Sequence, residues 1–274
     1  MRRNVEMTVL VDNIASEPLT AEWGLSILIT AGDRRILLDT GSSSVFARNA
    51  ELLGIDLAAV DTGVLSHAHH DHADGMEAFF EVNGTAPFLV REGVSENCWG
   101  VKDGVLRYNG IRKGILQEYR DRIRYVSGVY SIDDGIWLIP HRRADYRPIA
   151  KRNELYAEHG GKRVFDDFSH EQSLVIDSGG GLIVFSSCSH TGMANILEDV
   201  NEALGRNDVS AYVGGLHLYK MTDRETEELS GKIQGASVRR ILTGHCTGDK
   251  AFRILKEELG DGILQFSAGF SYRF

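Results

Sequence analysis

Ser66-His67-Ala68-His69-His70-Asp71-His72-Ala73-Asp74-Gly75 is the stretch of this chain that decides its fold. Four of the ten histidines fall within six of these positions, and His67, His69, Asp71 and His72 have the spacing H-x-H-x-D-H. Alternate residues at a strand end point the same way, so His67 and His69 can hold one ion. Asp71 and His72, where a helix over 72–80 is expected to begin, can face a second. These ligands suit zinc, or iron or manganese, and predict a metal site rather than a solvated His-rich turn.

Two later strand ends repeat this arrangement. The apolar run 182–187 leads into Cys188-Ser189-His190, and the run 238–242 leads into Thr243-Gly244-His245. We therefore predict that His190 and His245 are further metal ligands. Cys188 is a candidate bridging or supporting thiolate, with an inert buried cysteine as the alternative. His217 follows the predicted strand 209–214 and is a candidate to contact the substrate or its leaving group; a hydrogen-bonded core histidine is the alternative.

A strongly basic segment, 141–152, stands out in an otherwise acidic chain. Arginine binds phosphate through two parallel hydrogen bonds, so Arg142, Arg143 and Arg147 are candidates to bind an anionic or phosphorylated substrate. The alternative is a solvated loop, because runs of charge usually face water.

Composition excludes several classes of protein. Hydrophobic residues make up 42% of the 274 residues and charged residues 25%, which is typical of a globular protein. A net charge of −9 argues against non-specific binding to nucleic acid or to an anionic membrane. The three cysteines cannot all pair, which suits a reducing cytoplasm. No apolar run approaches the roughly 18 residues of a membrane span, so we expect a cytoplasmic protein with a small-molecule partner and leave its oligomeric state open.

The chain is expected to form a single domain over residues 1–274. Strands are predicted at 5–11, 25–29, 35–39 and 86–90, and a hairpin joins 173–177 to 182–187. Helices are predicted at 43–53, near 93–99, and at 193–204, 223–234 and 250–258, with Thr222 as an N-cap. No Pro-rich or Ser-rich linker divides these elements. The pattern is weak around 100–165, where we expect an insertion or cap.

The His motif resembles that of the metallo-β-lactamase superfamily. The resemblance implies an α/β (α+β) fold, a four-layer αββα sandwich, with two metal ions at the edge between the sheets. It also implies a role for Asp39, in Leu38-Asp39-Thr40-Gly41, as a carboxylate that supports the metal-binding loop from behind. The alternative is an aspartate that starts a turn and caps the helix 43–53.

Five further stretches are similar to one branch of that superfamily: 21–26, 171–175, 188–192, 214–218 and 244–248. The branch contains archaeal methanopterin-pathway enzymes of the dihydropteroate-synthase type and bacterial metal-dependent hydrolases. Trp23 stands where the branch usually has His, and His170 where it usually has Asp. His170 is therefore a further candidate for a metal-supporting or ligating residue, taking the place of the superfamily's mid-chain histidine.

Two functions follow from these resemblances. The first is a dinuclear hydrolase of an ester or phosphoester, in which His67, His69 and His190 hold one ion. Asp71, His72 and His245 would hold the other, and Asp71 would orient a metal-bridging water as nucleophile. The alternative is a transferase that joins a dihydropterin-methyl diphosphate to a ribofuranosyl-aminobenzene phosphate, with Trp23 or Trp99 stacking on the pterin. Iron-based oxygen or nitric-oxide reduction ranks below both, because no flavin domain accompanies the motif.

Overall fold

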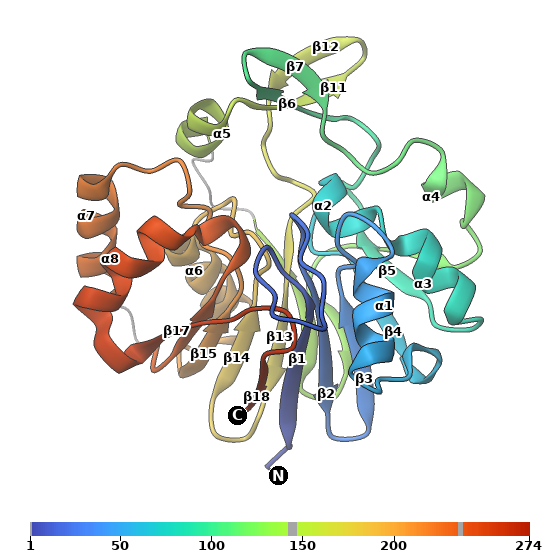
Figure 1. The fold of residues 1–274 in the computed structure, drawn as a ribbon, viewed down its shortest axis with the longest axis horizontal. Helices are drawn as coiled ribbons and strands as arrows, with labels where there is room; N and C mark the ends of the chain where they lie inside the picture. Colours follow the sequence, from blue (N-terminus) through green and yellow to red (C-terminus); the bar gives the residue numbers. More distant parts are fainter. Residues whose placement is uncertain (1, 142–146, 235–237) are drawn as a thin grey trace.

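The computed structural model describes residues 2–141, 147–234 and 238–274 (Figure 1). Its first large sheet has seven strands in the order β18-β1-β2-β3-β4-β5-β8. In chain order these are β1 (Val5–Val11), β2 (Ser26–Ala31), β3 (Arg34–Leu38), β4 (Thr62–Val64), β5 (Phe88–Arg91), β8 (Ile123–Val126) and β18 (Ser271–Arg273).

The second large sheet also has seven strands, in the order β17-β16-β15-β14-β13-β10-β9. They are β9 (Tyr130–Asp133), β10 (Ile136–Pro140), β13 (Gln172–Asp177), β14 (Leu182–Phe185), β15 (Val209–Val213), β16 (Ile241–Thr243) and β17 (Ile263–Gln265). β13 and β14 form the predicted hairpin, and β14, β15 and β16 run parallel.

The two sheets pack face to face through alternate residues of their strands. Val5, Met7 and Val9 of β1 are fully buried in one cluster with Leu174 and Ile176 of β13. Each such side chain contributes about 1.5–3 kcal/mol when fully removed from water. The period of two in the sequence therefore places one face of each strand in this core.

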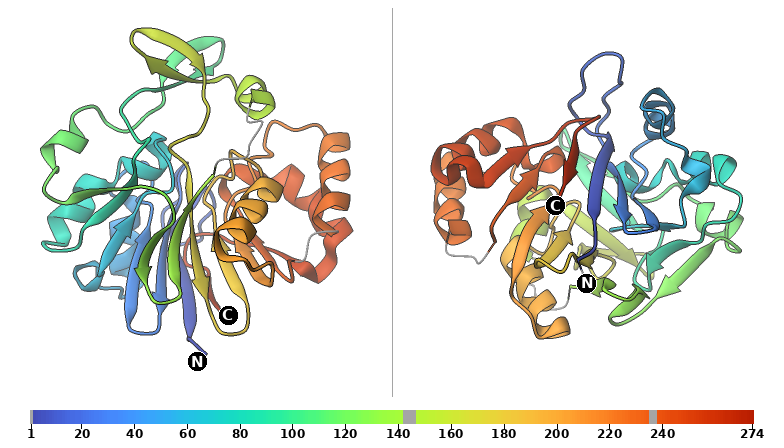
Figure 2. Two further views of the ribbon diagram at one scale, coloured as in Figure 1. Left: turned by 180° about the vertical axis from the view of Figure 1, so that it is seen from behind. Right: turned by 90° about the horizontal axis from the view of Figure 1, so that it is seen from below.

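Helices cover the outer faces of both sheets (Figures 1 and 2). One hydrophobic cluster joins the first sheet to α1 (Val45–Leu52) and α3 (Met76–Val82), and another joins the second sheet to α6 (Met193–Leu204), α7 (Asp223–Gln234) and α8 (Asp249–Leu259). This is the predicted four-layer αββα sandwich. The remaining helical segments are α2 (His70–Ala73), α4 (Ile115–Glu118), α5 (Arg147–Asn153), η1 (Leu57–Ala59), η2 (His245–Thr247) and η3 (Gly260–Gly262).

A small third sheet lies over the end of the sandwich opposite the two termini (Figure 1). Its strand order is β12 (Lys162–Phe165), β11 (Leu155–His159), β6 (Cys98–Lys102), β7 (Val105–Tyr108). The expected insertion at 100–165 is thus only partly separate, because β8, β9 and β10 within it belong to the two large sheets. The helix predicted near 93–99 is wrong: residues 93–97 form a turn and irregular backbone, and Cys98 and Trp99 pair with Ala157 and Tyr156 in a β ladder.

The helix predicted over 72–80 is two helices, α2 and α3, joined at Asp74 and Gly75. A Cβ at Gly75 would collide with the backbone carbonyl oxygen atoms of Thr40 and Ser43. Because Gly75 has no side chain, the end of the His motif packs directly against the loop that follows β3. No helix in the described part of the chain is long and apolar enough to cross a membrane.

Candidate metal centre

The chemistry-bearing side chains gather at one edge of the sandwich. His67 and His69 follow β4, His190 follows β14, His217 follows β15, and His245 follows β16. Parallel strands present their carboxyl ends at one edge of a sheet, which brings these residues together. All five side chains are at least nine-tenths buried.

The imidazoles of His72 and His245 face each other, with 3.2 Å between their Nε2 atoms. Nδ1 of His72 donates to Asp39 Oδ2 over 2.8 Å, and Nδ1 of His245 donates to Asn13 Oδ1 over 3.0 Å. When Nδ1 carries the proton of a neutral imidazole, Nε2 carries a lone pair. Two lone pairs at this distance repel each other unless a proton or a metal ion lies between them.

A second pair has the same geometry. Nε2 of His67 lies 3.2 Å from Nε2 of His190. The Ser66 hydroxyl donates to Asp39 and accepts from Nδ1 of His67, so Nε2 of His67 again carries the lone pair. His69 joins this pair, since His67, His69 and His190 each offer one donor atom within 4.8 Å of the others.

Asp39 supports both pairs from behind, as its resemblance to the superfamily aspartate implies. Oδ1 accepts the backbone N–H of Ser66, and Oδ2 accepts the Ser66 hydroxyl and Nδ1 of His72. The side chain is fully buried. One carboxylate therefore fixes the tautomer of His72 directly and that of His67 through Ser66.

Asp71 lies beside the facing imidazoles of His72 and His245. Its Oδ2 is 3.5 Å from Nε2 of His245 and accepts the indole N–H of Trp23 over 2.8 Å. The Trp23 ring, 47% exposed, packs against His245 and against Tyr219. Trp23 thus has a polar contact with the predicted ligand Asp71 as well as an open aromatic face.

Two thiols lie beside the paired imidazoles. Cys188 Sγ is 3.1 Å from Nε2 of His72, and the Cys246 thiol lies 3.6 Å from the Cys188 carbonyl oxygen. Donor atoms of His67, His72 and Cys188 lie within 4.8 Å of one another, as do those of Cys188, His245 and Cys246. Cys188 Sγ therefore lies among the nitrogen donors, where burial and Cys246 raise the pKa of its thiol, and its bridging or supporting role stays a prediction.

Several supporting residues were missed in the sequence. Glu171 accepts the backbone N–H groups of His190 and Thr191 and the Thr191 hydroxyl, and so holds the His190 loop. Asp12 accepts the backbone N–H of His245. A polar pair, Asp12-Asn13, directly after the apolar strand 5–11 is the signal that could have indicated the His245 support.

The backbone at the strand ends is held in an unusual conformation. Asp39, Ser189, His217 and His245 have φ of 60°, 54°, 54° and 47°. Non-glycine residues adopt the left-handed region at a cost, and such residues cluster at functional sites. Hydrogen bonds hold the Asp39 carboxylate and the His245 ring at the centre, whereas the Ser189 hydroxyl binds Tyr212 and the Gly215 carbonyl oxygen.

Charge in the centre is unevenly distributed. Burial and the neighbouring imidazoles hold the pKa of His67 and of His190 well below the usual value. Burial also lowers the pKa of His245, but Asp71 and Cys246 outweigh it and raise that pKa to about 9. Burial opposes ionisation of Asp71, yet His72 and His245 hold its pKa well below the usual value. His67 and His190 therefore offer neutral nitrogen donors, while the charge of Asp71 draws positive charge to His245.

A pocket of about 790 Å³ reaches these side chains. Aromatic residues Trp23, Tyr108 and Tyr219 line it, together with the cations Lys102, Arg107 and Lys220. His217 also lines it, and neither of its ring nitrogens has a hydrogen-bond partner among the described residues. β6, β7 and the residues before β11 form part of the wall, so the third sheet helps to enclose the pocket.

The structure places the other predicted residues away from the paired nitrogens or does not describe them. His170 accepts the backbone N–H of Ala68 at Nδ1 and turns Nε2 toward Asp166 and Cys98. Arg142 and Arg143 lie outside the described residues, and Arg147 is the first residue of α5. The cationic side chains that line the pocket come from other segments.

The donor set fits divalent metal ions. Imidazole nitrogens with fixed tautomers, one carboxylate and a thiol at strand ends are ligands that zinc, iron or manganese accept. Residues 22–192 match the family model of the metallo-beta-lactamase superfamily. The chain belongs to the metallo-beta-lactamase superfamily.

Three proteins are similar over nearly the whole of this chain. The 7,8-dihydropterin-6-methyl-4-(beta-D-ribofuranosyl)-aminobenzene-5'-phosphate synthase of Methanocaldococcus jannaschii is 26% identical, over 99% of this chain and 97% of that protein. The solved structure of Tm1679, a metal-dependent hydrolase of the beta-lactamase superfamily, is 29% identical with a TM-score of 0.82, over 98% of each chain. A metallo-beta-lactamase fold protein of Bacillus subtilis, YhfI, shares the fold at 14% identity, with a TM-score of 0.62 over 99% of this chain and 100% of that one.

Proposed function

We propose that this chain is a dinuclear metal-dependent hydrolase of phosphate-bearing esters. The observation that carries the proposal is the two pairs of facing Nε2 atoms, each 3.2 Å apart, beside a pocket with cationic side chains. The similarity to a metal-dependent hydrolase over the whole chain supports it. One ion would be held by His67, His69 and His190, and the other by Asp71, His72 and His245.

The chemistry divides between the ions and the chain. Bound divalent cations, with zinc favoured over iron or manganese, supply Lewis-acid stabilisation of negative charge and an acidified water. Asp71, fixed by the Trp23 indole, orients the attacking water. The water releases one proton to solvent as its oxygen forms a bond to phosphorus, the P–O bond to the alcohol breaks with its electron pair, and the leaving oxygen takes a proton. His217, with unpartnered ring nitrogens beside the pocket, is our candidate donor of that proton.

The substrate class follows from charge on the pocket wall. Lys102 and Arg107 project from the hairpin of β6 and β7, and Lys220 lies beside Tyr219. The acidic residues Asp103 and Glu154 line the same pocket and offset part of this positive charge. Cationic side chains beside a metal centre still favour an anionic substrate over a neutral lactone or ester. Contributions from Arg142, Arg143 and Arg147 stay part of the proposal.

The test is turnover of the metal-loaded protein on phosphodiesters, phosphomonoesters and lactones. A double change, Lys102→Ala with Arg107→Ala, should raise KM for phosphodiesters by about 10-fold or more, because charge-assisted hydrogen bonds contribute about 1.5–3 kcal/mol. Lys162→Ala, which removes an exposed lysine of β12, is the matched control. Loaded protein that hydrolyses lactones but no phosphoester would contradict the substrate class, and absence of any hydrolysis would contradict the function.

The second candidate is the synthase reaction. The whole-length relative and the three aromatic residues of the pocket favour it. In that reaction an amine nitrogen attacks the pterin methylene carbon, the C–O bond to diphosphate breaks, and the amine releases a proton. Fluorescence titration with a dihydropterin distinguishes the two: saturable binding that Trp23→Ala abolishes supports the synthase, and no binding removes it.

A further inference from the structure

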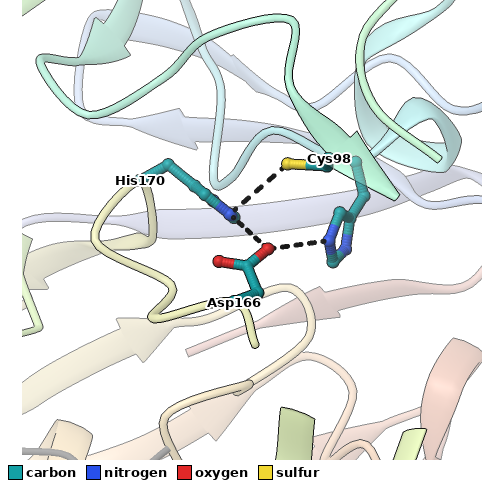
Figure 3. Close-up of side chains that lie close together, drawn as sticks. Cys98, Asp166 and His170 are labelled. Atoms are coloured by element: carbon teal, nitrogen blue, oxygen red, sulfur yellow. Dashed lines mark hydrogen bonds and ion pairs between the residues drawn. The ribbon is translucent and has the colours of Figure 1, made fainter. Parts of the chain in front are cut away.

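Three buried side chains lie beside His69 and form a cluster of four with it. Cys98 of β6, Asp166 and His170 point toward one another (Figure 3). His69, from the His motif, offers a donor atom within 4.8 Å of theirs. Their exposed fractions are 0%, 0%, 3% and 3%. Nε2 of His170 is 3.2 Å from Asp166 Oδ2 and 3.7 Å from Cys98 Sγ, and Nε2 of His69 is 3.8 Å from the same Asp166 oxygen.

A hydrogen bond from the backbone fixes which ring nitrogen of His170 carries a hydrogen. The backbone N–H of Ala68 donates to Nδ1 of His170, so Nδ1 carries the lone pair and Nε2 carries the hydrogen of the neutral ring. That hydrogen points at Asp166 and Cys98. His170 therefore acts as a donor toward the cluster. Although the four donor atoms lie within 4.8 Å of one another, His170 could be a metal ligand through Nε2 only by losing its one ring N–H hydrogen.

Asp166 accepts from both sides. Oδ1 accepts the backbone N–H of Phe168, which fixes the carboxylate in its turn. Oδ2 receives the His170 hydrogen and faces Nε2 of His69, which has no hydrogen-bond partner among the described residues. A buried carboxylate next to an imidazole nitrogen favours a hydrogen on that nitrogen. The other ring nitrogen of His69, Nδ1, is then left with the lone pair.

We propose that Asp166, held by His170, is the positioning residue that keeps the hydrogen of His69 on Nε2 and offers Nδ1 of His69 to the metal centre. The inference rests on the proposed metal centre. His170 has a double role, since its Nδ1 also holds the backbone of Ala68, the residue between His67 and His69. His170 thus acts on the metal centre indirectly, through Asp166 and through the backbone of Ala68.

The test combines nitrogen NMR of histidine-labelled protein with metal affinity. In the wild-type protein, with and without zinc, His69 should carry its hydrogen on Nε2. Asp166→Asn keeps an oxygen for Phe168 but turns an amide N–H₂ toward His69, so it should abolish this tautomer preference and weaken zinc binding by about 10- to 100-fold. Asp167→Asn is the matched control, because exposed Asp167 makes the same type of turn bond, to Ser169.

Two outcomes would overturn the proposal. One is a wild-type His69 with its hydrogen on Nδ1, which metal-free protein reveals even if no metal binds. The other is Asp166→Asn with unchanged tautomer and zinc affinity. Cys98→Ser should leave zinc content unchanged; loss of one zinc ion in this variant would instead assign a metal to the cluster. A protein that shows the Nε2 tautomer but binds no metal would refute the proposed function separately.

Discussion

Asp39 Oδ2 lies 2.8 Å from Nδ1 of His72, although the residues are 33 positions apart in the chain. Asp39 has a positive φ at the end of β3, and the same carboxylate accepts the backbone and hydroxyl of Ser66. The end of one strand thus sets the proton positions of the His motif that follows the next strand. Asp39 does not line the pocket, yet through these hydrogen bonds it orients the imidazoles of the metal centre.

We predict that Asp39→Asn weakens zinc binding by about 10- to 100-fold. The amide cannot accept from Ser66 and His72 with both of its polar atoms, so one imidazole loses its fixed tautomer. Isothermal titration or chelator competition measures the change. Asp56→Asn is the control, since exposed Asp56 only caps η1 through Ala58. Equal zinc affinity in Asp39→Asn and wild type would contradict the supporting role.

Trp23→Phe separates the hydrogen bond of Trp23 from its aromatic face. The variant keeps a ring but loses the N–H that binds Asp71 Oδ2. A hydrogen bond to a charged group contributes about 1.5–3 kcal/mol, so kcat on a phosphodiester should fall by roughly 10-fold or more with little change in KM. Trp23→Ala should raise KM in addition. A KM effect alone in Trp23→Phe would show that the indole N–H does not position Asp71.

Gly75→Ala should destabilise the protein by about 1–3 kcal/mol, as overpacking does in a close-packed site. The added methyl would meet the carbonyl oxygens of Thr40 and Ser43. Chemical denaturation measures the free energy of unfolding. Gly84→Ala is the control, because a Cβ there meets no atom within 4 Å. Similar unfolding free energies in the two variants would argue against this contact between α3 and the β3 loop.

Lowering the pH should destabilise the N-terminal turn of α7. The backbone N–H and hydroxyl of Thr222 both donate to Glu225, and they lower the pKa of that carboxylate. A pKa that is lower in the folded state stabilises the protein above the unfolded value of about 4.3, and this stabilisation is lost as pH falls through the folded value. The difference in unfolding free energy between wild type and Glu225→Gln should therefore favour wild type near neutral pH and vanish in acid. Exposed Glu227→Gln, in the same helix, should show no such trend.

The sequence predicted the parts of the fold that depend on local pattern. Alternating residues in 5–11 and the turn-separated runs around 178–181 are β1 and the β13–β14 hairpin in the structure. The failure near 93–99 has a long-range cause: Cys98 and Trp99 are strand residues only because β11, more than fifty positions later, pairs with them. Propensity over a short window cannot contain that information.

The candidate site was predictable where ligands follow strands. His67, His190 and His245 each follow a strand. In the structure Nε2 of His67 lies 3.2 Å from Nε2 of His190, and Nε2 of His245 lies 3.2 Å from Nε2 of His72. Asp12 and Glu171 were not predicted, because each binds the backbone of a loop that is distant in the sequence. Asp166 was not predicted either: its partner His170 is close in the sequence, but His69, which it also faces, is far away. The lining residues Lys102 and Arg107 were missed for the same reason, since only the third sheet brings them to the pocket.

The most direct test of the metal centre is anomalous scattering from crystals of the zinc-loaded protein. We predict one peak within ligand distance of Nε2 of His67 and His190, and a second within ligand distance of Nε2 of His72 and His245. Zinc found only elsewhere, or no peak at either pair in protein that has been loaded with the metal, would contradict the account.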